Sequence, residues 1–196
     1  MSPLNKRQLD QIRDERTTQI KQAALQVFAR HGFARTKTSM IAAAAGISEG
    51  LIYRYFESKD ELFTAIVREL MEDATEEVED SRHVPGTPYE RIRALTQNIL
   101  DEKNKYAFML ILKARKTDEL PAEVARIFER HSENALIDRL IPIFVKGQQA
   151  GEFAPGDPRE RLFWYISILN SLILCEQGEE EYGFPDVDLL MRMLTK

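Results

Sequence analysis

Residues 32–62 read GFARTKTSMIAAAAGISEGLIYRYFESKDEL, and this stretch decides the fold of the chain. An Ala-rich segment, a glycine and a Tyr/Arg-rich segment follow one another at the spacing of a helix-turn-helix. Two helices that cross steeply need a small residue at the crossing, a turn residue that accepts positive φ and an apolar residue facing back. Ala42, Gly46 and Ile52 have these properties at intervals of four and six residues. The pattern therefore predicts two short helices joined by a tight turn.

Serine residues mark the predicted starts of two helices in this stretch. Ser48 precedes the Tyr/Arg-rich helix, where its hydroxyl can accept a hydrogen bond from a backbone N–H, and Glu49 suits the helix dipole. Ser58 is predicted to cap the next helix, with Asp60 and Glu61 in its first turn. An ordinary hairpin of Ala-rich helices would account for the same features, and the rest of the chain has to discriminate between the two interpretations.

Charge is distributed unevenly along a chain of otherwise ordinary globular composition. The 196 residues are 43% hydrophobic and 30% charged, with a net charge of -5, which is typical of a domain with a substantial core. Residues 1–60 carry 10 Lys/Arg and 6 Asp/Glu, whereas residues 61–196 carry 17 and 26. The part that contains the motif is therefore the basic part, and its net positive charge suits a polyanionic partner.

Cysteine usage and hydropathy indicate a cytoplasmic protein. Cys175 is the single cysteine of the sequence, so we expect no internal disulfide and interpret Cys175 as a small buried hydrophobe. The first residues lack the apolar core of a signal peptide. The longest nearly apolar run, residues 162–175, falls short of the roughly 20 residues that span a bilayer, so no membrane helix is expected.

Helical periodicity dominates the whole chain. Ile20, Ala24, Val27 and Phe28 form one apolar stripe, which predicts a helix from about residue 10 to the glycine at 32. Because alternating β-branched residues are not found, the fold class predicted is all-α with about nine helices. Pro142 is expected to kink or split one of them. The helices predicted after the motif begin at Ser58 and then cover residues 88–103, 105–116, 121–149, 157–177 and 186–195.

The motif resembles the N-terminal domain of the TetR family of bacterial transcriptional regulators. The residues that carry the resemblance are Gly32, Phe33, Thr36, Ile41, Ala42, Ala44, Ala45, Gly46, Ile47, Ser48, Gly50, Ile52, Tyr53, Tyr55, Phe56, Ser58, Lys59 and Leu62. The resemblance implies a three-helix helix-turn-helix DNA-binding domain over residues 1–57 and a helical effector-binding and dimerisation domain over residues 58–196. Glu49 departs from the family pattern, in which lysine is frequent: a carboxylate there weakens attraction to phosphate, although it could accept a hydrogen bond from the N4 amine of cytosine.

Eight residues are predicted to bind double-stranded DNA. Gly50 lets the helix backbone approach the groove, and Arg54 can pair with the O6 and N7 of guanine or else contact a phosphate. Tyrosine hydroxyls can donate to phosphates. The resemblance adds Thr38 and Lys59 as contacts to the DNA backbone. The complete DNA-binding set is Lys37, Thr38, Ser48, Gly50, Tyr53, Arg54, Tyr55 and Lys59.

The second half of the chain is predicted to form a dimer and to bind a small molecule. Residues 162–175 are apolar nearly all round, and a second stripe at helical spacing lies near the end of the chain, so both are expected in a dimer interface, with a larger intramolecular core as the alternative. The second stripe consists of Val187, Leu190, Met191 and Leu194. Residues that could line an apolar effector pocket, although plain core or surface positions would account for each, are Tyr106, Phe108, Met109, Phe128, His131, Trp164 and Asn170.

The function expected is ligand-responsive, sequence-specific regulation of transcription by a homodimer on a palindromic operator. We expect a repressor that an apolar or amphipathic effector releases, with activation as an open alternative. A DNA-independent helical ligand-binding or scaffolding protein is the rival, and it leaves Gly50, Tyr53 and Lys59 unexplained. The sequence contains no phosphate-binding loop, metal-spaced histidine pair or Ser/His/Asp set, so we expect no enzyme activity, no metal and no cofactor.

Overall fold

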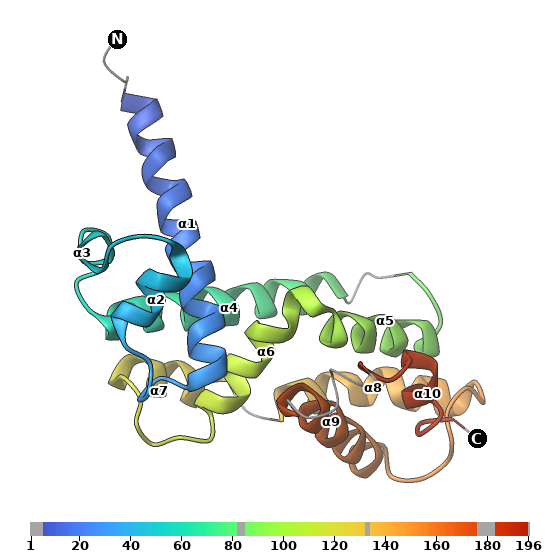
Figure 1. The fold of residues 1–196 in the computed structure, drawn as a ribbon. Coiled ribbons are helices and arrows are strands. Elements are labelled where there is room, and N and C mark those ends of the chain that lie inside the picture. The colour runs from blue at the N-terminus through green and yellow to red at the C-terminus, as the bar shows by residue number, and fades with distance from the viewer. Residues whose placement is uncertain (1–5, 82–84, 132–133, 176–182, 196) are drawn as a thin grey trace.

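The computed structural model describes residues 6–81, 85–131, 134–175 and 183–195, and its regular elements in these ranges are all helices (Figure 1). The all-α prediction is therefore confirmed for this part of the chain. None of the described helices is both long and apolar enough to cross a bilayer. The helices are α1 (Lys6–His31), α2 (Thr38–Ala45), α3 (Glu49–Ile52), α4 (Lys59–Ser81), α5 (Pro88–Leu100), α6 (Glu102–Ala114), α7 (Ala122–Arg130), α8 (Ala135–Gln149), α9 (Pro158–Leu174) and α10 (Val187–Met191).

The single helix predicted over residues 121–149 is wrong, because the chain divides it into α7 and α8. His131 leaves the helical conformation at φ -118° and ψ 98°. Its carbonyl accepts a hydrogen bond of 2.9 Å from the guanidinium of Arg115, a partner from outside the helix that a sequence pattern does not reveal. Pro142 lies inside α8, so the proline does not set the break.

An aromatic cluster joins α1 to α4. The predicted stripe on α1 is buried, and Phe28 at its end is 1% exposed. The Phe63 ring of α4 meets the Phe28 ring edge-on, with 4.8 Å between centroids, and lies 4.8 Å from the Phe33 ring. These contacts fix α4 against the N-terminal helices. The predicted domain boundary between residues 57 and 58 falls just before α4, which also contacts α7.

α6 binds the C-terminal end of α1 from the other side. The Arg30 guanidinium donates a hydrogen bond to the Tyr106 hydroxyl and lies 5.2 Å from the centroid of that ring. The Lys113 ammonium donates to the Arg30 carbonyl over 3.1 Å. In Figure 1, α6 crosses the end of α1, while the other end of α1 projects away from the rest of the chain. α1 is therefore held by elements from both predicted domains.

The second half of the chain packs α5, α8, α9 and α10 together (Figure 1). The Phe144 and Phe153 rings stack with 4.6 Å between centroids. The buried Tyr165 hydroxyl on α9 lies 2.7 Å from the Thr96 hydroxyl on α5, and burial raises the pKa of Tyr165. The Arg93 side chain of α5 donates to Asp188 of α10 over 2.6 Å and lowers the pKa of that carboxyl. α10 is thereby attached to the core of its own chain.

Because α10 is attached to its own chain, most of the apolar stripe predicted near the C-terminal end is buried inside the chain. Leu190, Met191 and Leu194 are at most 6% exposed, because α10 folds back onto α5 and the Leu194 carbonyl accepts from the Ala154 N–H over 2.9 Å. The intramolecular core, held open as the alternative, is correct for these three residues. Val187 is half-buried. The prediction that Cys175 is buried is also wrong, because Cys175 follows the last turn of α9 and is exposed.

Candidate functional site

The turn between α2 and α3 has the geometry that the sequence predicts. Gly46 adopts φ 66° and ψ 32°, a left-handed conformation that favours glycine. The N–H of Ile47 donates to the Ala42 carbonyl over 3.0 Å, while Ala42 and Ile52 are 4% and 1% exposed. Gln19 of α1 donates to the Ala45 carbonyl over 2.8 Å, so α1 supports the end of α2. The helix-turn-helix is therefore a rigid, supported unit.

The helix after the turn is short and continues as a series of turns. α3 has four residues, and the N–H groups of Tyr55 and Phe56 then donate to the Ile52 carbonyl over 2.9 and 3.0 Å. Ser48 stands at the N-cap, but its hydroxyl makes no capping bond. The N–H of Leu51, one of the donors that a capping bond can use, donates instead to the Ser48 carbonyl over 3.0 Å. The cap predicted at Ser58 is confirmed, since its hydroxyl accepts from the Glu61 N–H over 3.0 Å.

The residues predicted to bind DNA gather around the start of α2 and the length of α3. Tyr53 is 51% exposed, and Arg54 is exposed beside it. Tyr55 is half-buried against the core. In Figure 1, α3 lies at the side of the molecule opposite to α8 and α10. The other exposed members of the set are Lys37, Ser48 and Gly50, and Thr38 and Lys59 are half-buried.

A hydroxyl and carboxylate network links α2 to α3. The Thr38 hydroxyl donates to the Glu49 carboxylate and lies 3.2 Å from the Tyr53 hydroxyl. Because the single Thr38 proton goes to Glu49, the Tyr53 hydroxyl is the donor of the second bond. Glu49 therefore positions Thr38 and, through it, Tyr53, a role that the sequence did not reveal.

Lys59 has two carbonyl partners within the protein. Its ammonium donates to the carbonyls of Phe33 and Thr36 over 3.0 and 3.1 Å and lies 4.3 Å from the centroid of the Phe33 ring. The side chain thus holds the turn between α1 and α2. The contact of Lys59 with phosphate stays a prediction, and a substitution there would also loosen this turn.

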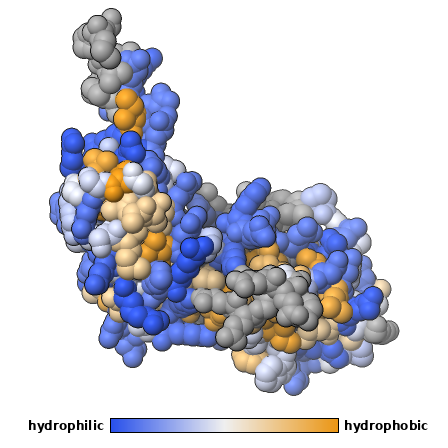
Figure 2. Space-filling model, in the orientation of Figure 1, coloured by the Kyte–Doolittle hydropathy of each residue, from blue (hydrophilic) through white to orange (hydrophobic). Residues whose placement is uncertain are grey.

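The N-terminal half of α1, next to this unit, has a largely hydrophilic surface. Figure 2 shows mainly hydrophilic residues along the projecting part of α1, whereas hydrophobic residues are more frequent elsewhere on the visible face. Arg7, Arg13 and Arg16 all lie on this part of α1, and the first two are exposed. Basic side chains of this kind supply the attraction to phosphates that does not depend on sequence.

The residues predicted to bind an effector are not gathered in one pocket. The Tyr106 hydroxyl faces Arg30 of α1, and the Phe128 ring lies 4.5 Å below the Arg115 guanidinium. Trp164 is 59% exposed on α9 and lines a depression there. Phe108 is half-buried and Met109 buried on α6, and Asn170 is half-buried on α9. Their role in binding stays a prediction.

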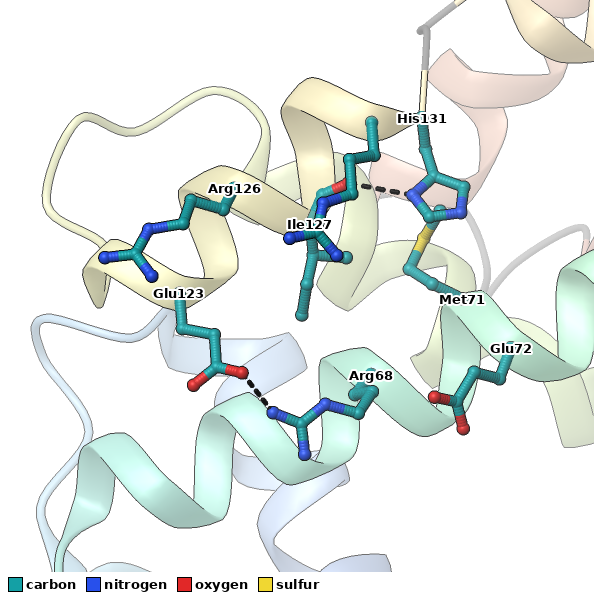
Figure 3. Close-up of a pocket in the computed structure, with 8 residues that line it drawn as sticks. Arg68, Met71, Glu72, Glu123, Arg126, Ile127 and His131 are labelled. Atoms are coloured by element: carbon teal, nitrogen blue, oxygen red, sulfur yellow. Dashed lines mark hydrogen bonds and ion pairs between the residues drawn. The ribbon is translucent and has the colours of Figure 1, made fainter.

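His131 lies elsewhere, in a groove between α4 and α7 (Figure 3). The groove has a volume of about 460 Å³. His131 stands at one end, with its Nδ1 2.8 Å from the Ile127 carbonyl. Arg68, Arg126 and Arg130 also line it. The sequence does not reveal these three arginines, because arginines on amphipathic helices usually form solvated faces. The i, i+4 spacing of Arg126 and Arg130 is the one signal that points to them.

The chain is similar to known bacterial regulators. The family model described as "Bacterial regulatory proteins, tetR family" matches residues 20–66. The fatty acid metabolism regulator protein of Bacillus subtilis (strain 168) is 27% identical over 142 residues, which cover 70% of this chain and 71% of that protein.

Solved structures share the fold over almost the whole chain. FadR from Bacillus subtilis in complex with stearoyl-CoA has a TM-score of 0.60 at 21% identity and covers 90% of this chain and 94% of its own. AibR in complex with isovaleryl coenzyme A and operator DNA has a TM-score of 0.66 at 21% identity, with the same coverage of 90% and 94%. The helical arrangement that surrounds the helix-turn-helix is thus one already known.

Proposed function

Because this chain belongs to the TetR family of bacterial regulatory proteins, we propose that it is a ligand-responsive, sequence-specific DNA-binding regulator of transcription. The observation that carries this function is the exposed surface of the turns directly after α3, which presents Tyr53 and Arg54 in the helix-turn-helix. The protein acts in the cytoplasm as a homodimer on a palindromic operator. It is a repressor that a small molecule releases from DNA.

The two α3 helices of the dimer enter successive major grooves. In this arrangement the first helical turns reach base edges and the flanks contact phosphates. Arg54 reads guanine, Tyr53 and Tyr55 contact the DNA backbone or thymine methyl groups, and Gly50 allows close approach. Lys37, Thr38, Ser48 and Lys59 complete the contacts to phosphate.

Replacement of Arg54 by alanine tests sequence-specific binding. We expect Arg54→Ala to weaken binding to the operator by about 1–3 kcal/mol, because it removes a bidentate bond to guanine. Binding to random DNA should change much less. The operator is obtained by sequencing genomic DNA that the purified protein captures, and affinities are measured by mobility shift at several salt concentrations.

The matched control is Lys37→Ala, an exposed cation at the start of α2. We expect it to weaken specific and random binding alike and to make the salt slope shallower by roughly one unit. An Arg54→Ala protein that loses the same affinity for both DNAs would remove the base-reading role. The rival, a helical protein that does not bind DNA, requires that the wild type shift no DNA even at low salt.

Gly50→Ala is expected to separate folding from DNA binding. A Cβ at Gly50 would meet no atom within 4 Å, and alanine loses less backbone entropy than glycine in a helix. The free energy of unfolding should therefore rise by up to about 1 kcal/mol, while operator affinity falls because the added methyl group faces the DNA. Chemical denaturation and mobility shifts measure the two effects. Undiminished operator affinity would show that α3 does not approach DNA at this residue.

The effector is an apolar or amphipathic molecule, and an acyl-coenzyme A is the first class to test. FadR and AibR, which share the fold, are known in complex with stearoyl-CoA and isovaleryl coenzyme A respectively. Bound ligand would shift α4 and change the spacing of the two α3 helices, which have to match grooves about 34–36 Å apart. Release of operator DNA on addition of each acyl-coenzyme A is the measurement. A ligand that binds tightly without changing operator affinity would contradict this mechanism.

Exposed apolar side chains on α9, on α10 and just after α10 form the proposed dimer surface. Phe163 and Trp164 are 47% and 59% exposed, and Leu189 and Met193 are 56% and 41% exposed. The opposite face of α9, which includes Leu169, is buried in the chain itself. A helix that is apolar on both sides buries the second side against a partner, and closed twofold symmetry makes the same patch available on each subunit.

A further inference from the structure

The groove between α4 and α7 combines cationic walls with an apolar floor. Arg68 and Met71 belong to α4, and Arg126, Ile127 and Arg130 belong to α7. Ile127 is 9% exposed, whereas Arg126 and Arg130 are exposed. Figure 3 shows Arg68 and Glu123 facing each other across the space between the two helices.

The charges of the groove favour an anion. Three guanidinium groups and two carboxylates, Glu72 and Glu123, line it. The three arginines and two glutamates sum to one positive charge, in a chain whose net charge is -5. Guanidinium groups form paired, parallel hydrogen bonds with phosphate oxygens. The groove thus suits a phosphate-bearing group that is attached to an apolar chain.

One of the guanidinium groups already has an anionic partner. Arg68 of α4 donates to the Glu123 carboxylate of α7. Both side chains are about half exposed, at 48% and 56%, and exposed ion pairs are weak. A phosphate group with two charges is therefore able to replace Glu123 as the partner of Arg68. This exchange would occur on α4, the helix that packs on α1 through Phe63.

We propose that this groove binds the phosphate-bearing end of an amphipathic effector, and that the bound phosphates displace Glu123 from Arg68. Arg126 and Arg130 hold the phosphates, and Met71 and Ile127 contact the first carbons of the apolar chain. Loss of the Arg68–Glu123 ion pair removes one of the contacts that hold α4 against α7. This inference rests on the proposed function, since it names the class of effector and the contact through which it acts.

Calorimetry with two test variants and two control variants of the protein tests the site, with stearoyl-CoA as the probe. The double variant Arg126→Ala/Arg130→Ala should bind stearoyl-CoA at least about tenfold more weakly than the wild type, because charged hydrogen bonds are lost. Glu123→Gln should bind it more tightly, because the competing carboxylate is gone. Controls are Arg139→Ala, an exposed arginine on α8, and Glu102→Gln, in the first turn of α6 as Glu123 is in that of α7. Both controls should bind like the wild type.

Other probes identify the part of the effector that the groove recognises. Stearate, which lacks phosphate, should bind the wild type and the double variant equally. Coenzyme A without an acyl chain should bind more weakly than stearoyl-CoA, and inorganic pyrophosphate more weakly still. Circular dichroism of each variant, together with Arg130→Lys, which keeps the charge, excludes loss of folding as the cause of weak binding.

Three results with the variants would overturn the inference. They are unchanged stearoyl-CoA affinity in the double variant, an equal loss for stearate and stearoyl-CoA, and a Glu123→Gln variant that does not bind more tightly. A wild type that fails to bind stearoyl-CoA also overturns it. Each of these leaves the proposed function intact as long as the wild type binds its operator, whereas the absence of operator binding would defeat the proposed function itself.

Discussion

Phe63→Ala is expected to lower the free energy of unfolding by about 3–5 kcal/mol. The Phe63 side chain is 1% exposed, and its ring contacts the rings of Phe28 and Phe33. Truncation removes apolar contacts between α1, the turn after α1 and α4. It leaves a cavity that the stiff helices α1 and α4 cannot fill. Urea denaturation at one fixed protein concentration measures the change, since the proposed dimerisation would make stability depend on concentration.

The control for Phe63→Ala is Ile12→Ala on the projecting part of α1. Ile12 is 46% exposed, so its truncation should change stability by no more than about 0.5 kcal/mol. The operator affinity of Phe63→Ala should fall as well, because the helix-turn-helix loses its support on α4. Similar stabilities for Phe63→Ala and Ile12→Ala would show that the aromatic cluster is not the contact that joins these helices.

Gly147→Ala should destabilise the protein by about 1–3 kcal/mol, the usual cost of overpacking a core. A Cβ at Gly147 would lie 2.3 Å from Cδ2 of Phe153 and 3.0 Å from Cβ of Pro88. The Phe153 ring is 1% exposed and stacked on Phe144, so it has no room to move aside. The substitution therefore separates α5 from α8. Thermal and urea denaturation measure the loss.

Gly50→Ala is the matched control for Gly147→Ala. Both glycines lie in helices and both changes add one methyl group, but the Cβ at Gly50 would enter open space. Helix propensity alone predicts stabilisation at both positions. We expect opposite signs, and a stabilising Gly147→Ala would mean that the α5–α8 contact is looser than the structure shows.

Local patterns predicted those parts of the fold whose contacts lie close in sequence. The Ala42, Gly46 and Ile52 spacing fixed the turn because the residues concerned are within ten positions of one another, and each has a conformational or steric requirement of its own. The stripe on α1 was likewise correct. A stripe predicts that a face is buried, however, and not what covers it. Leu190 and Met191 were therefore assigned to a dimer interface although they cover their own core.

Contacts between residues far apart in the sequence could not be predicted from local patterns. Arg68 and Glu123 are 55 positions apart, and either one alone is an ordinary exposed charge. The same holds for Lys59, whose ammonium binds carbonyls 23 and 26 positions away. Glu49 departs visibly from the family pattern, but its bond to Thr38 depends on the crossing of α2 and α3. Local position predicts the candidate DNA-binding residues, whereas the groove between α4 and α7 exists only in the tertiary fold.

The attachment of α1 to both α4 and α6 limits where the DNA-binding part of this protein can be joined to the effector domain of a relative. A hybrid regulator joined between residues 57 and 58 would take Phe28 away from Phe63, and Arg30 away from Tyr106 and Lys113. A new effector domain would have to supply an aromatic ring and a pair of polar side chains at matching places. To exchange DNA specificity between relatives, α4 should therefore be transferred together with α1, α2 and α3. The face of α6 that contacts α1 should be kept as well, because the part that has to match is a packing surface and not a continuous segment of chain.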